Sequence, residues 1–167
     1  MEMNPEPREK SLACRKIEER FPQAALDWHA EHGDETLLLR KDAIFEVARL
    51  LKEDPELQFN LLVDITAVDY FGRHPRFEIV YHFLSLPFNQ RLRIKLQSDD
   101  LHPTIKSLTP LWKTANWLER ECFDMYGIRF EGHPNLTRVL LYEEFQGHPL
   151  RKDYPKTKRQ PLIGPQN

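Results

Sequence analysis

The residues whose types and spacing could do chemistry lie closest together in the run WLERECFDMYG at positions 117–127. If this run is helical, Trp117, Glu121 and Asp124 share a face, because they are four and then three positions apart. Paired carboxylates can act as general acid and base, so a stand-alone hydrolase using Glu119, Glu121 and Asp124 is one candidate. A merely charged helix face is a second interpretation. We favour a third, a partner-binding face, since the aromatic residues of this run cannot all be buried under one small sheet.

Two Gly-His-Pro units, at 132–134 and 147–149, place His133 and His148 where metal ligands could be suspected. Proline holds the preceding residue extended and glycine permits a reversal, so we expect turns at both places. No carboxylate or thiol stands at ligand spacing from either histidine. Cys14 and Cys122 lie 108 positions apart, whereas an iron–sulfur cluster usually needs four thiolates in local groups. We therefore expect no metal or cluster in this chain, and a buried, inert Cys122.

The segment PLRKDYP at 149–155 combines prolines with basic and aromatic residues. Such a patch could bind phosphate or RNA, which makes an RNA-binding α+β module another alternative. The formal net charge of the chain is −2, which gives no long-range attraction to nucleic acid or anionic lipid. Docking against an acidic protein surface is the interpretation that we favour.

The composition is that of an ordinary globular protein of 167 residues, with 40% apolar and 30% charged residues, and it suits one domain. No apolar run approaches the roughly 18 residues that would suggest a membrane span. The first residues lack the apolar stretch of a secretory signal. If the protein works at a membrane, we expect another protein to hold it there.

Apolar and polar residues alternate in the middle of the chain, which predicts strands. Leu61, Val63, Ile65 and Ala67 are expected on one strand face, and the pattern repeats over 77–83 and 92–96. The last strand is the clearest, with apolar residues at 92, 94 and 96 opposite basic residues at 91, 93 and 95. A further short strand is expected at 36–40. Short links with turn residues predict an antiparallel meander.

Helices are predicted around this sheet at about 8–20, at 44–51, just after Pro103 and at 115–125. Asp42 and Thr114 are expected to cap the second and last of these helices, and Gly127 to end the last. Together the elements predict an α+β fold, with an antiparallel or mixed sheet of about four strands built mainly from 59–98 and helices on one face. We expect residues 1–133 to form this domain. Residues 134–167 are rich in proline, and we expect an extended tail that docks on a partner protein.

Three stretches of the sequence together resemble one family, the 30 kDa (C) subunit of respiratory complex I. They are WKTANWLERECFDMYGIRFEGHP at 112–134, FQGHPLRKDYP at 145–155 and VDITAVDY at 63–70, and the resemblance spans about two-thirds of the chain. One position departs from the family pattern, since Thr137 stands where a basic residue or proline is usual. Arg138 beside it keeps a charge there.

The resemblance implies a structural subunit of the peripheral arm of NADH–quinone oxidoreductase, whose electron transfer from NADH to quinone is coupled to proton translocation. It implies no catalytic, cofactor-binding or metal-binding residue in this chain, with FMN, iron–sulfur clusters and quinone held by partner subunits. The implied partners are the 49 kDa-type (D) subunit and the B- and I-type subunits, at the cytoplasmic face of the bacterial inner membrane. The alternative is the equivalent subunit of an energy-converting hydrogenase, or of a quinone oxidoreductase complex fed by another donor.

The interface with these partners is expected on the 117–126 helix and on the turns and basic segments that follow it. The residues proposed for it are Trp117, Glu119, Arg120, Glu121, Asp124, Tyr126, His133, Pro134, Arg138, Arg151, Lys152, Asp153 and Tyr154.

Overall fold

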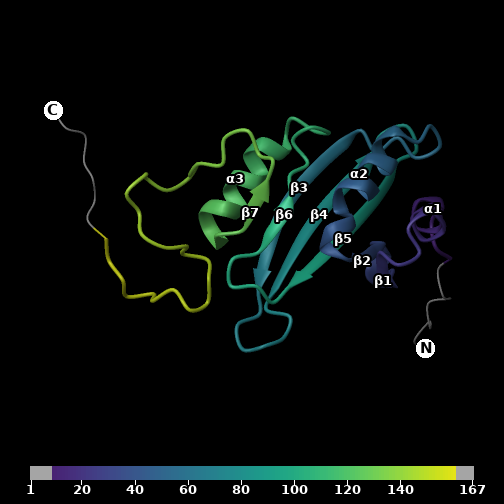
Figure 1. The fold of residues 1–167 in the computed structure, drawn as a ribbon. Helices are drawn as coiled ribbons and strands as arrows, with labels where there is room; N and C mark the ends of the chain where they lie inside the picture. The colour runs from purple at the N-terminus through teal and green to yellow at the C-terminus, as the bar shows by residue number, and fades with distance from the viewer. Residues whose placement is uncertain (1–8, 161–167) are drawn as a thin grey trace.

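A computed structural model describes residues 9–160, and Figure 1 shows its helices beside one large sheet. The helices are α1 (Leu12–Arg20), α2 (Ile44–Glu53) and α3 (Ala115–Tyr126), with short 3₁₀ helices η1 (Glu31–Gly33) and η2 (Lys41–Ala43). The strands are β1 (Ala25–His29), β2 (Thr36–Leu39), β3 (Leu61–Asp69), β4 (Phe77–Ser85), β5 (Gln90–Ser98), β6 (Thr104–Lys106) and β7 (Arg129–Glu131).

The main sheet has five strands in the order β1-β2-β5-β4-β3. Strands β3, β4 and β5 form the predicted antiparallel meander, while β2 pairs parallel to β5 and β1 antiparallel to β2. A second, two-stranded sheet pairs β6 parallel to β7. The α+β class and the mixed sheet are thus confirmed. The sequence did not indicate β1 or the short β7, and the segment ALDWH of β1 lacks regular alternation.

The core lies on one face of the large sheet. Leu92, Ile94 and Leu96 of β5 are at most 2% exposed, as their alternation predicted. The buried residues of α2, among them Val47 and Leu51, belong to the same apolar cluster. Helices therefore cover this face, and the charged residues of β5 point to the other one.

The predicted face of β3 is wrong in its first half. A bulge between Leu62 and Asp64 shifts the register with β4, so the side chains change sides there. Leu62 is buried, whereas Val63 is 56% exposed; Ile65 and Ala67 are buried as predicted. One extra residue in a strand reverses the side-chain alternation, and the residue types at 61–67 do not mark the site of the bulge.

Helix α3 lies along β3, which is an edge strand of the sheet. The Cys122 thiol donates a hydrogen bond to the Ile65 carbonyl at 3.2 Å, and the Thr114 hydroxyl donates one to the Leu62 carbonyl at 3.3 Å. These contacts cover part of a strand edge that would otherwise offer unpaired backbone groups. The segment after α3 then runs outward beside it (Figure 1).

Of the two predicted helix caps, one is right in position and the other is wrong. Thr114 occupies the N-cap position of α3, but its side chain makes no capping bond, because its hydroxyl bonds the Leu62 carbonyl. Asp42 lies inside η2, and its carboxylate accepts from the Arg40 side chain. The N-terminal helix begins at Leu12 rather than near residue 8, and the Ser11 hydroxyl caps it.

The short helix predicted after Pro103 is also wrong, since Thr104–Lys106 form strand β6. Ile105 is 2% exposed and pairs with Phe130 of β7. Pairing with a strand about 25 residues away overrides the weak helical signal of a proline. Within residues 9–160, no helix has the length and apolar character needed to cross a bilayer.

Candidate functional site: helix α3 and the strap

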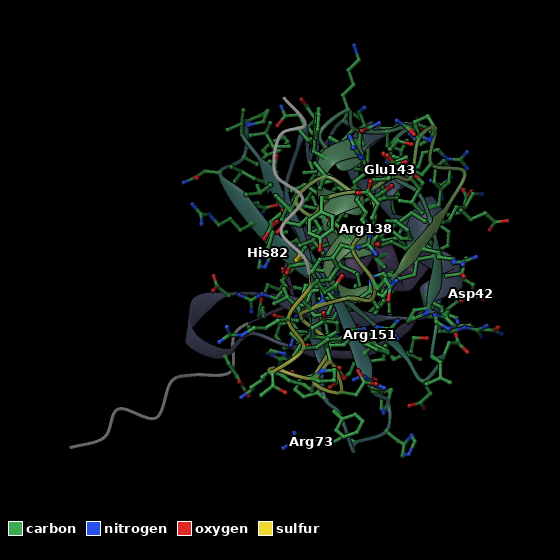
Figure 2. The ribbon with its side chains drawn as sticks, turned by 90° about the vertical axis from the view of Figure 1, so that its left-hand side faces the viewer. Asp42, Arg73, His82, Arg138, Glu143 and Arg151 are labelled. Carbon is green, nitrogen blue, oxygen red and sulfur yellow. The ribbon has the colours of Figure 1, made fainter. Side chains whose placement is uncertain are left out.

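The site predicted from the sequence consists of α3 and the segment after it, residues 134–160, which we call the strap. Helix α3 ends at Gly127, which has a φ of +74° in the left-handed region, as predicted. A Cβ atom at this position would lie 2.6 Å from Nε2 of His148 and 2.9 Å from Nη2 of Arg151. Gly127 thus ends the helix and also leaves room for the strap to cross its end. Figure 2 views the molecule from the strap side, with Arg138 and Arg151 labelled there.

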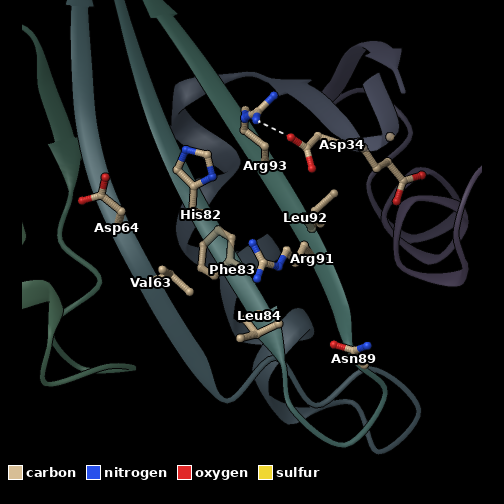
Figure 3. A pocket seen from close by; sticks show the side chains of 12 residues that line it. Asp34, Val63, Asp64, His82, Phe83, Leu84, Asn89, Arg91, Leu92 and Arg93 are labelled. Atoms are coloured by element: carbon tan, nitrogen blue, oxygen red, sulfur yellow. Dashed lines mark hydrogen bonds and ion pairs between the residues drawn. The ribbon is translucent and has the colours of Figure 1, made fainter. Parts of the chain in front are cut away.

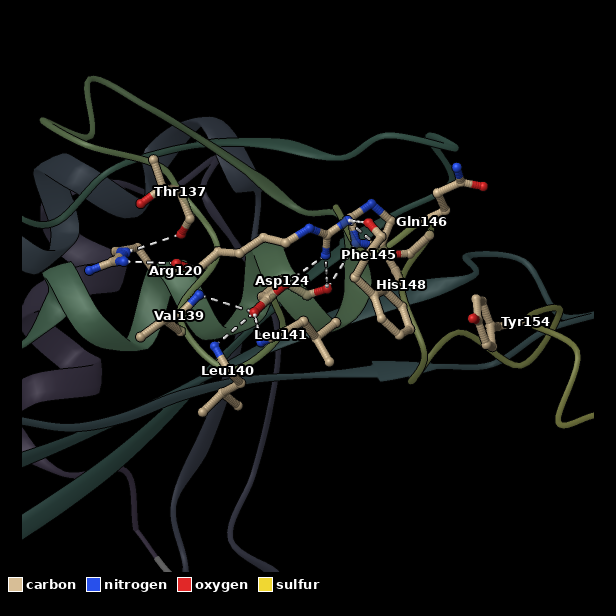
Figure 4. Close-up of polar contacts among 12 residues, drawn as sticks. Arg120, Asp124, Thr137, Val139, Leu140, Leu141, Phe145, Gln146, His148 and Tyr154 are labelled. Carbon is tan, nitrogen blue, oxygen red and sulfur yellow. Dashed lines mark hydrogen bonds and ion pairs between the residues drawn. The ribbon is translucent and has the colours of Figure 1, made fainter. Parts of the chain in front are cut away.

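Asp124 is the centre of the strap's attachment to α3 (Figure 4). Its Oδ2 atom accepts hydrogen bonds from three successive backbone N–H groups, those of Val139, Leu140 and Leu141, at 2.9–3.0 Å. Its Oδ1 atom accepts one from Arg138 at 2.6 Å. Burial by itself would raise the pKa of Asp124, but these donors outweigh it and hold the pKa below its ordinary value.

The expected exposure of Asp124 on a partner-binding face is therefore wrong, because the side chain is fully buried. The helical spacing placed Asp124 beside Trp117 and Glu121 correctly, but this chain's own strap covers it. The side chain cannot contact a partner directly. Its role in the structure is to hold the strap backbone at residues 139–141.

Glu119 is also fully buried, which corrects its expected place at the interface. One oxygen accepts from the Leu108 N–H at 2.6 Å and the other from the Ser107 hydroxyl at 2.7 Å. Burial raises the pKa of Glu119 to about 7, although the two donors act in the opposite direction. The carboxylate fixes the 107–109 turn to α3 and does not face solvent.

Two of the three arginines of the predicted interface, Arg120 and Arg138, hold backbone carbonyls of the strap. Arg120 donates to the carbonyls of Thr137 and Arg138 at 3.0 and 2.8 Å. Arg138 in turn donates to the carbonyls of Phe145 and Gly147, at 2.8 and 3.1 Å. These bonds close the loop that runs from Arg138 to Gly147. At Thr137, the position that departs from the family pattern, the contact with α3 is made by the backbone.

The basic segment 151–153 is attached to the domain at three points. The Arg151 guanidinium donates to the carbonyls of Tyr126 and Leu101 at 2.5 and 2.8 Å. The Lys152 N–H donates to Asp69 at 2.8 Å, and Asp153 pairs with Arg76 at 3.0 Å.

Asp69 and Arg76 are site residues that the sequence reasoning missed. They form a two-point ion pair with distances of 2.8 and 2.9 Å, and Arg76 lowers the pKa of Asp69. No local signal pointed to them, because Asp69 meets a residue 83 positions further along the chain.

The histidines of the Gly-His-Pro units serve turns. Nε2 of His133 lies 3.1 Å from the Asn116 carbonyl, and Nδ1 of His148 lies 2.9 Å from the Asp124 carbonyl. Pro134 after the first histidine is exposed, as is Glu121 on α3. Tyr154 stacks on Phe145 with ring centroids 6.0 Å apart. Gln160 donates a hydrogen bond to the Tyr154 hydroxyl at 2.8 Å, which holds the end of the strap close to Tyr154.

Large apolar and aromatic side chains are exposed on this side, in addition to charged ones. Trp117 is 61% exposed, and the Arg120 guanidinium lies over its ring at 4.9 Å. Leu140, whose backbone N–H is bonded to Asp124, is 62% exposed. Tyr126 is half-buried at the C-terminal end of the helix. The arrangement presents large side chains on a backbone that is held by charge-assisted hydrogen bonds.

A separate groove of about 770 Å³ lies on the open face of the large sheet (Figure 3). Asp64, His82 and Arg91, from three neighbouring strands, line it together with Val63 and others. Burial and the nearby Arg93 lower the pKa of His82. The lining includes no serine, threonine or cysteine that such a histidine could activate.

The described part of the chain offers few side chains that could bind a metal ion or act as a thiol nucleophile. Across residues 9–160, no group of three or more histidine, cysteine, aspartate or glutamate side chains could hold a metal ion. Cys14 and Cys122 are buried, and burial raises the pKa of both thiols well above the ordinary value. A protonated, buried thiol is a poor nucleophile.

Comparison with known proteins gives one consistent result. Residues 37–160 match the family model described as "Respiratory-chain NADH dehydrogenase, 30 Kd subunit". The chain is 46% identical over 147 residues to the C subunit of NADH-quinone oxidoreductase from Citrifermentans bemidjiense, covering 88% of this chain and 90% of that protein. It is 45% identical over 147 residues to the protein of the same name from Roseiflexus sp., covering 88% and 84%.

Solved structures agree with this. A trypsin-resistant fragment of Nqo5 superposes with a TM-score of 0.64 at 30% identity, covering 75% of this chain and 100% of that one. A chain of an archaeal membrane-bound sulfane sulfur reductase has the same fold, with a TM-score of 0.72 at 23% identity over 86% of this chain and 84% of that one. On the family match and on the identity along most of the length of both proteins, the chain belongs to the family of the 30 kDa subunit of respiratory-chain NADH dehydrogenase.

Proposed function

We propose that this chain is a non-catalytic, structural subunit in the peripheral arm of respiratory complex I, the NADH–quinone oxidoreductase. The complex transfers electrons from NADH to quinone and couples this transfer to proton translocation. The observation that carries the proposal is the family membership, together with relatives that bear the name of the C subunit of that oxidoreductase. The chain's contribution is to hold other subunits in place.

The geometry of α3 and the strap supports a role in docking. Asp124 and Arg138 fix the strap backbone that carries the exposed Leu140, and the exposed Trp117 stands on helix α3 under the Arg120 guanidinium. Both side chains therefore have defined positions before any partner binds. Preorganised aromatic and apolar side chains bind well, because little conformational entropy is lost on association. We propose this surface as the seat of the 49 kDa-type (D) subunit, with the B- and I-type subunits nearby.

The same contacts argue against the hydrolase that the carboxylates of α3 first suggested. A general acid and base need to reach a substrate. Glu119 and Asp124 are buried and bonded to this chain's own backbone, which leaves Glu121 alone on the exposed side. We therefore propose that the chain itself has no catalytic or cofactor-binding residue. FMN, the iron–sulfur clusters and quinone would be held by partner subunits, in a complex attached to the cytoplasmic face of the bacterial inner membrane.

The test is to isolate the complex through an affinity tag on this chain. We expect the D-, B- and I-type subunits to be recovered with it, along with NADH–quinone reductase activity. Deleting the chain should abolish that activity in membranes, and expression of the chain in trans should restore it. Recovery of a complex that reduces quinone or protons from another donor, and not from NADH, would favour the alternative complexes. Turnover of a substrate by the purified chain alone would contradict a structural role.

A further inference from the structure

The charge of the chain is divided unevenly. Residues 150–160 (LRKDYPKTKRQ) contain five basic residues and one acidic residue, a net charge of +4. Because the whole chain has a net charge of −2, the remaining residues have a net charge of −6. The last part of the strap is thus a strongly basic segment on an acidic protein.

This basic segment is held against the domain by its own contacts. Arg151 donates to the carbonyls of Tyr126 and Leu101, and the Lys152 N–H donates to Asp69. The segment's single acid, Asp153, is paired with Arg76 of the domain. The backbone that carries the neighbouring cations is therefore attached to the domain, and the one carboxylate among them is already engaged.

Four cations of the segment take no part in these attachments through their side chains. Their side chains are exposed, and within residues 9–160 none makes a hydrogen bond or ion pair; they belong to Lys152, Lys156, Lys158 and Arg159. Lys158 lies 5.7 Å from the ring of Tyr154. Tyr154 and Gln160 hold this part of the strap against Phe145 and Gln146, so the backbone between the cations is attached at both ends. We call these four residues the basic edge.

We propose that the basic edge docks on an acidic protein surface within the complex, a proposal that rests on the function proposed above. A cluster of exposed cations on an attached backbone, beside a tyrosine, suits a partner surface that carries carboxylates. A polyanion of large extent, such as nucleic acid or an anionic bilayer, would also repel the rest of the chain, whose net charge is −6. A local acidic patch attracts the basic edge without this penalty.

The experiment measures how fast the purified full chain joins membranes that contain the complex without it. The test variant reverses three charges, Lys152→Glu, Lys156→Glu and Lys158→Glu. The control variant reverses three exposed cations elsewhere whose side chains also make no bond within residues 9–160, Arg15→Glu, Arg91→Glu and Arg129→Glu. Both variants change the net charge equally. At low salt we expect the test variant to associate at least about 10-fold more slowly than the control, with a flatter salt dependence.

A second variant, with glutamine at the same three lysines, separates the effect of the lost charges from an effect of misfolding. It should show an intermediate loss, while its thermal melting matches that of the unchanged chain. Equal association rates for the test and control variants would overturn the proposal. The proposal would also be overturned if the test variant assembled normally but no longer bound vesicles of phosphatidylglycerol in phosphatidylethanolamine, or no longer bound a single-stranded RNA. The partner of the basic edge would then be lipid or nucleic acid. If the unchanged chain does not join the complex at all, the proposed function fails instead.

Discussion

Asp124 and Glu119 show how the same environment gives two carboxyl groups opposite properties. Both side chains are fully buried on α3. Desolvation raises the pKa of each, but Asp124 accepts three backbone N–H bonds and one from a guanidinium, and its pKa ends below the ordinary value. Glu119 has two donors and no cation among the groups that shift it, and its pKa rises to about 7. The number and charge of the donors decide the protonation state of a buried acid.

The substitution Asp124→Asn should destabilise the free chain. It keeps the side-chain shape but directs an amide NH₂ at the Arg138 guanidinium or at the N–H groups of residues 139–141. We expect a loss of about 2–3 kcal/mol in the free energy of unfolding, as for an unpaired group at a buried site. Urea unfolding measures it, and hydrogen exchange at 139–141 should accelerate.

Glu121→Gln is the matched control for Asp124→Asn, since Glu121 is an exposed carboxylate on the same helix. Its effect on the free energy of unfolding should stay within about 0.5 kcal/mol. If both substitutions had equal, small effects, Asp124 would not be fastening the strap.

Glu119 should make stability depend on pH. Its pKa in the folded chain is about 7, above the ordinary value of 4.5 that applies in the unfolded chain. The folded state therefore binds the proton more tightly, so this contribution is fully present below about pH 4.5 and is lost as the pH rises through about 7. In the unchanged chain, the free energy of unfolding should therefore fall with rising pH, and Glu119→Gln should remove roughly 2–3 kcal/mol of this fall. Urea unfolding between about pH 5 and pH 8 would show it, and parallel curves for both proteins would contradict the assignment.

At the scale of elements, the junction between α3 and the strap depends on Gly127. Gly127→Ala introduces left-handed backbone strain and also a Cβ atom that overlaps His148 and Arg151. Gly132→Ala is the control, because Gly132 has a similar φ of +81° but nothing within 4 Å of the added atom. We expect about 1 kcal/mol of destabilisation at Gly132 and about 3 kcal/mol at Gly127. If thermal unfolding showed equal destabilisation for both variants, the strap would be moving away from the added Cβ atom without a loss of stability.

The strap should be separable from the core. Every residue in the buried apolar cluster lies between Ala13 and Phe130, and Leu136 is the only apolar residue of strap 134–160 that packs against it. A chain truncated after Leu141 should keep a cooperative thermal transition, with a loss of about 2 kcal/mol in stability from the missing Arg151 and Asp153 contacts. It should no longer enter the complex on a native gel. Normal assembly of the truncated chain would show that the strap beyond Leu141 is dispensable for docking.

At the scale of the whole molecule, stability and assembly should respond to different residues. Trp117 is 61% exposed and stacks only on Arg120 among the described residues. Trp117→Ala should therefore lower the stability of the free chain by less than about 1 kcal/mol. It should weaken assembly by roughly 2 kcal/mol or more, as expected for an interface hot spot. Recovery of the intact complex on a native gel, beside a thermal melt of the free chain, tests both parts.

Leu26 provides the comparison for Trp117. It is 56% exposed, but it lies on β1, away from α3 in the sheet order. Leu26→Ala should leave assembly unchanged. An equal loss of assembly for Leu26→Ala and Trp117→Ala would place the interface elsewhere or spread it over the molecule.

Local patterns in the sequence were sufficient for several features. The alternation at 91–97 determined which face of β5 is buried, because a strand of period two has no other way to segregate apolar residues. The periodicity of 115–125 determined α3, and Gly127 determined its end, because few other residues tolerate a left-handed φ. The family motifs could also be recognised from the sequence alone.

Tertiary structure alone decided which charged residues are free to meet a partner. Helical spacing puts Trp117, Glu121 and Asp124 on one face, but it cannot show that residues 138–141 cover Asp124, or that 107–108 cover Glu119. The pairing of Asp69 with the Lys152 backbone spans 83 positions, and the bulge near Val63 has no local marker. Such contacts depend on where distant segments meet in space, and residue types along the chain do not encode this locally.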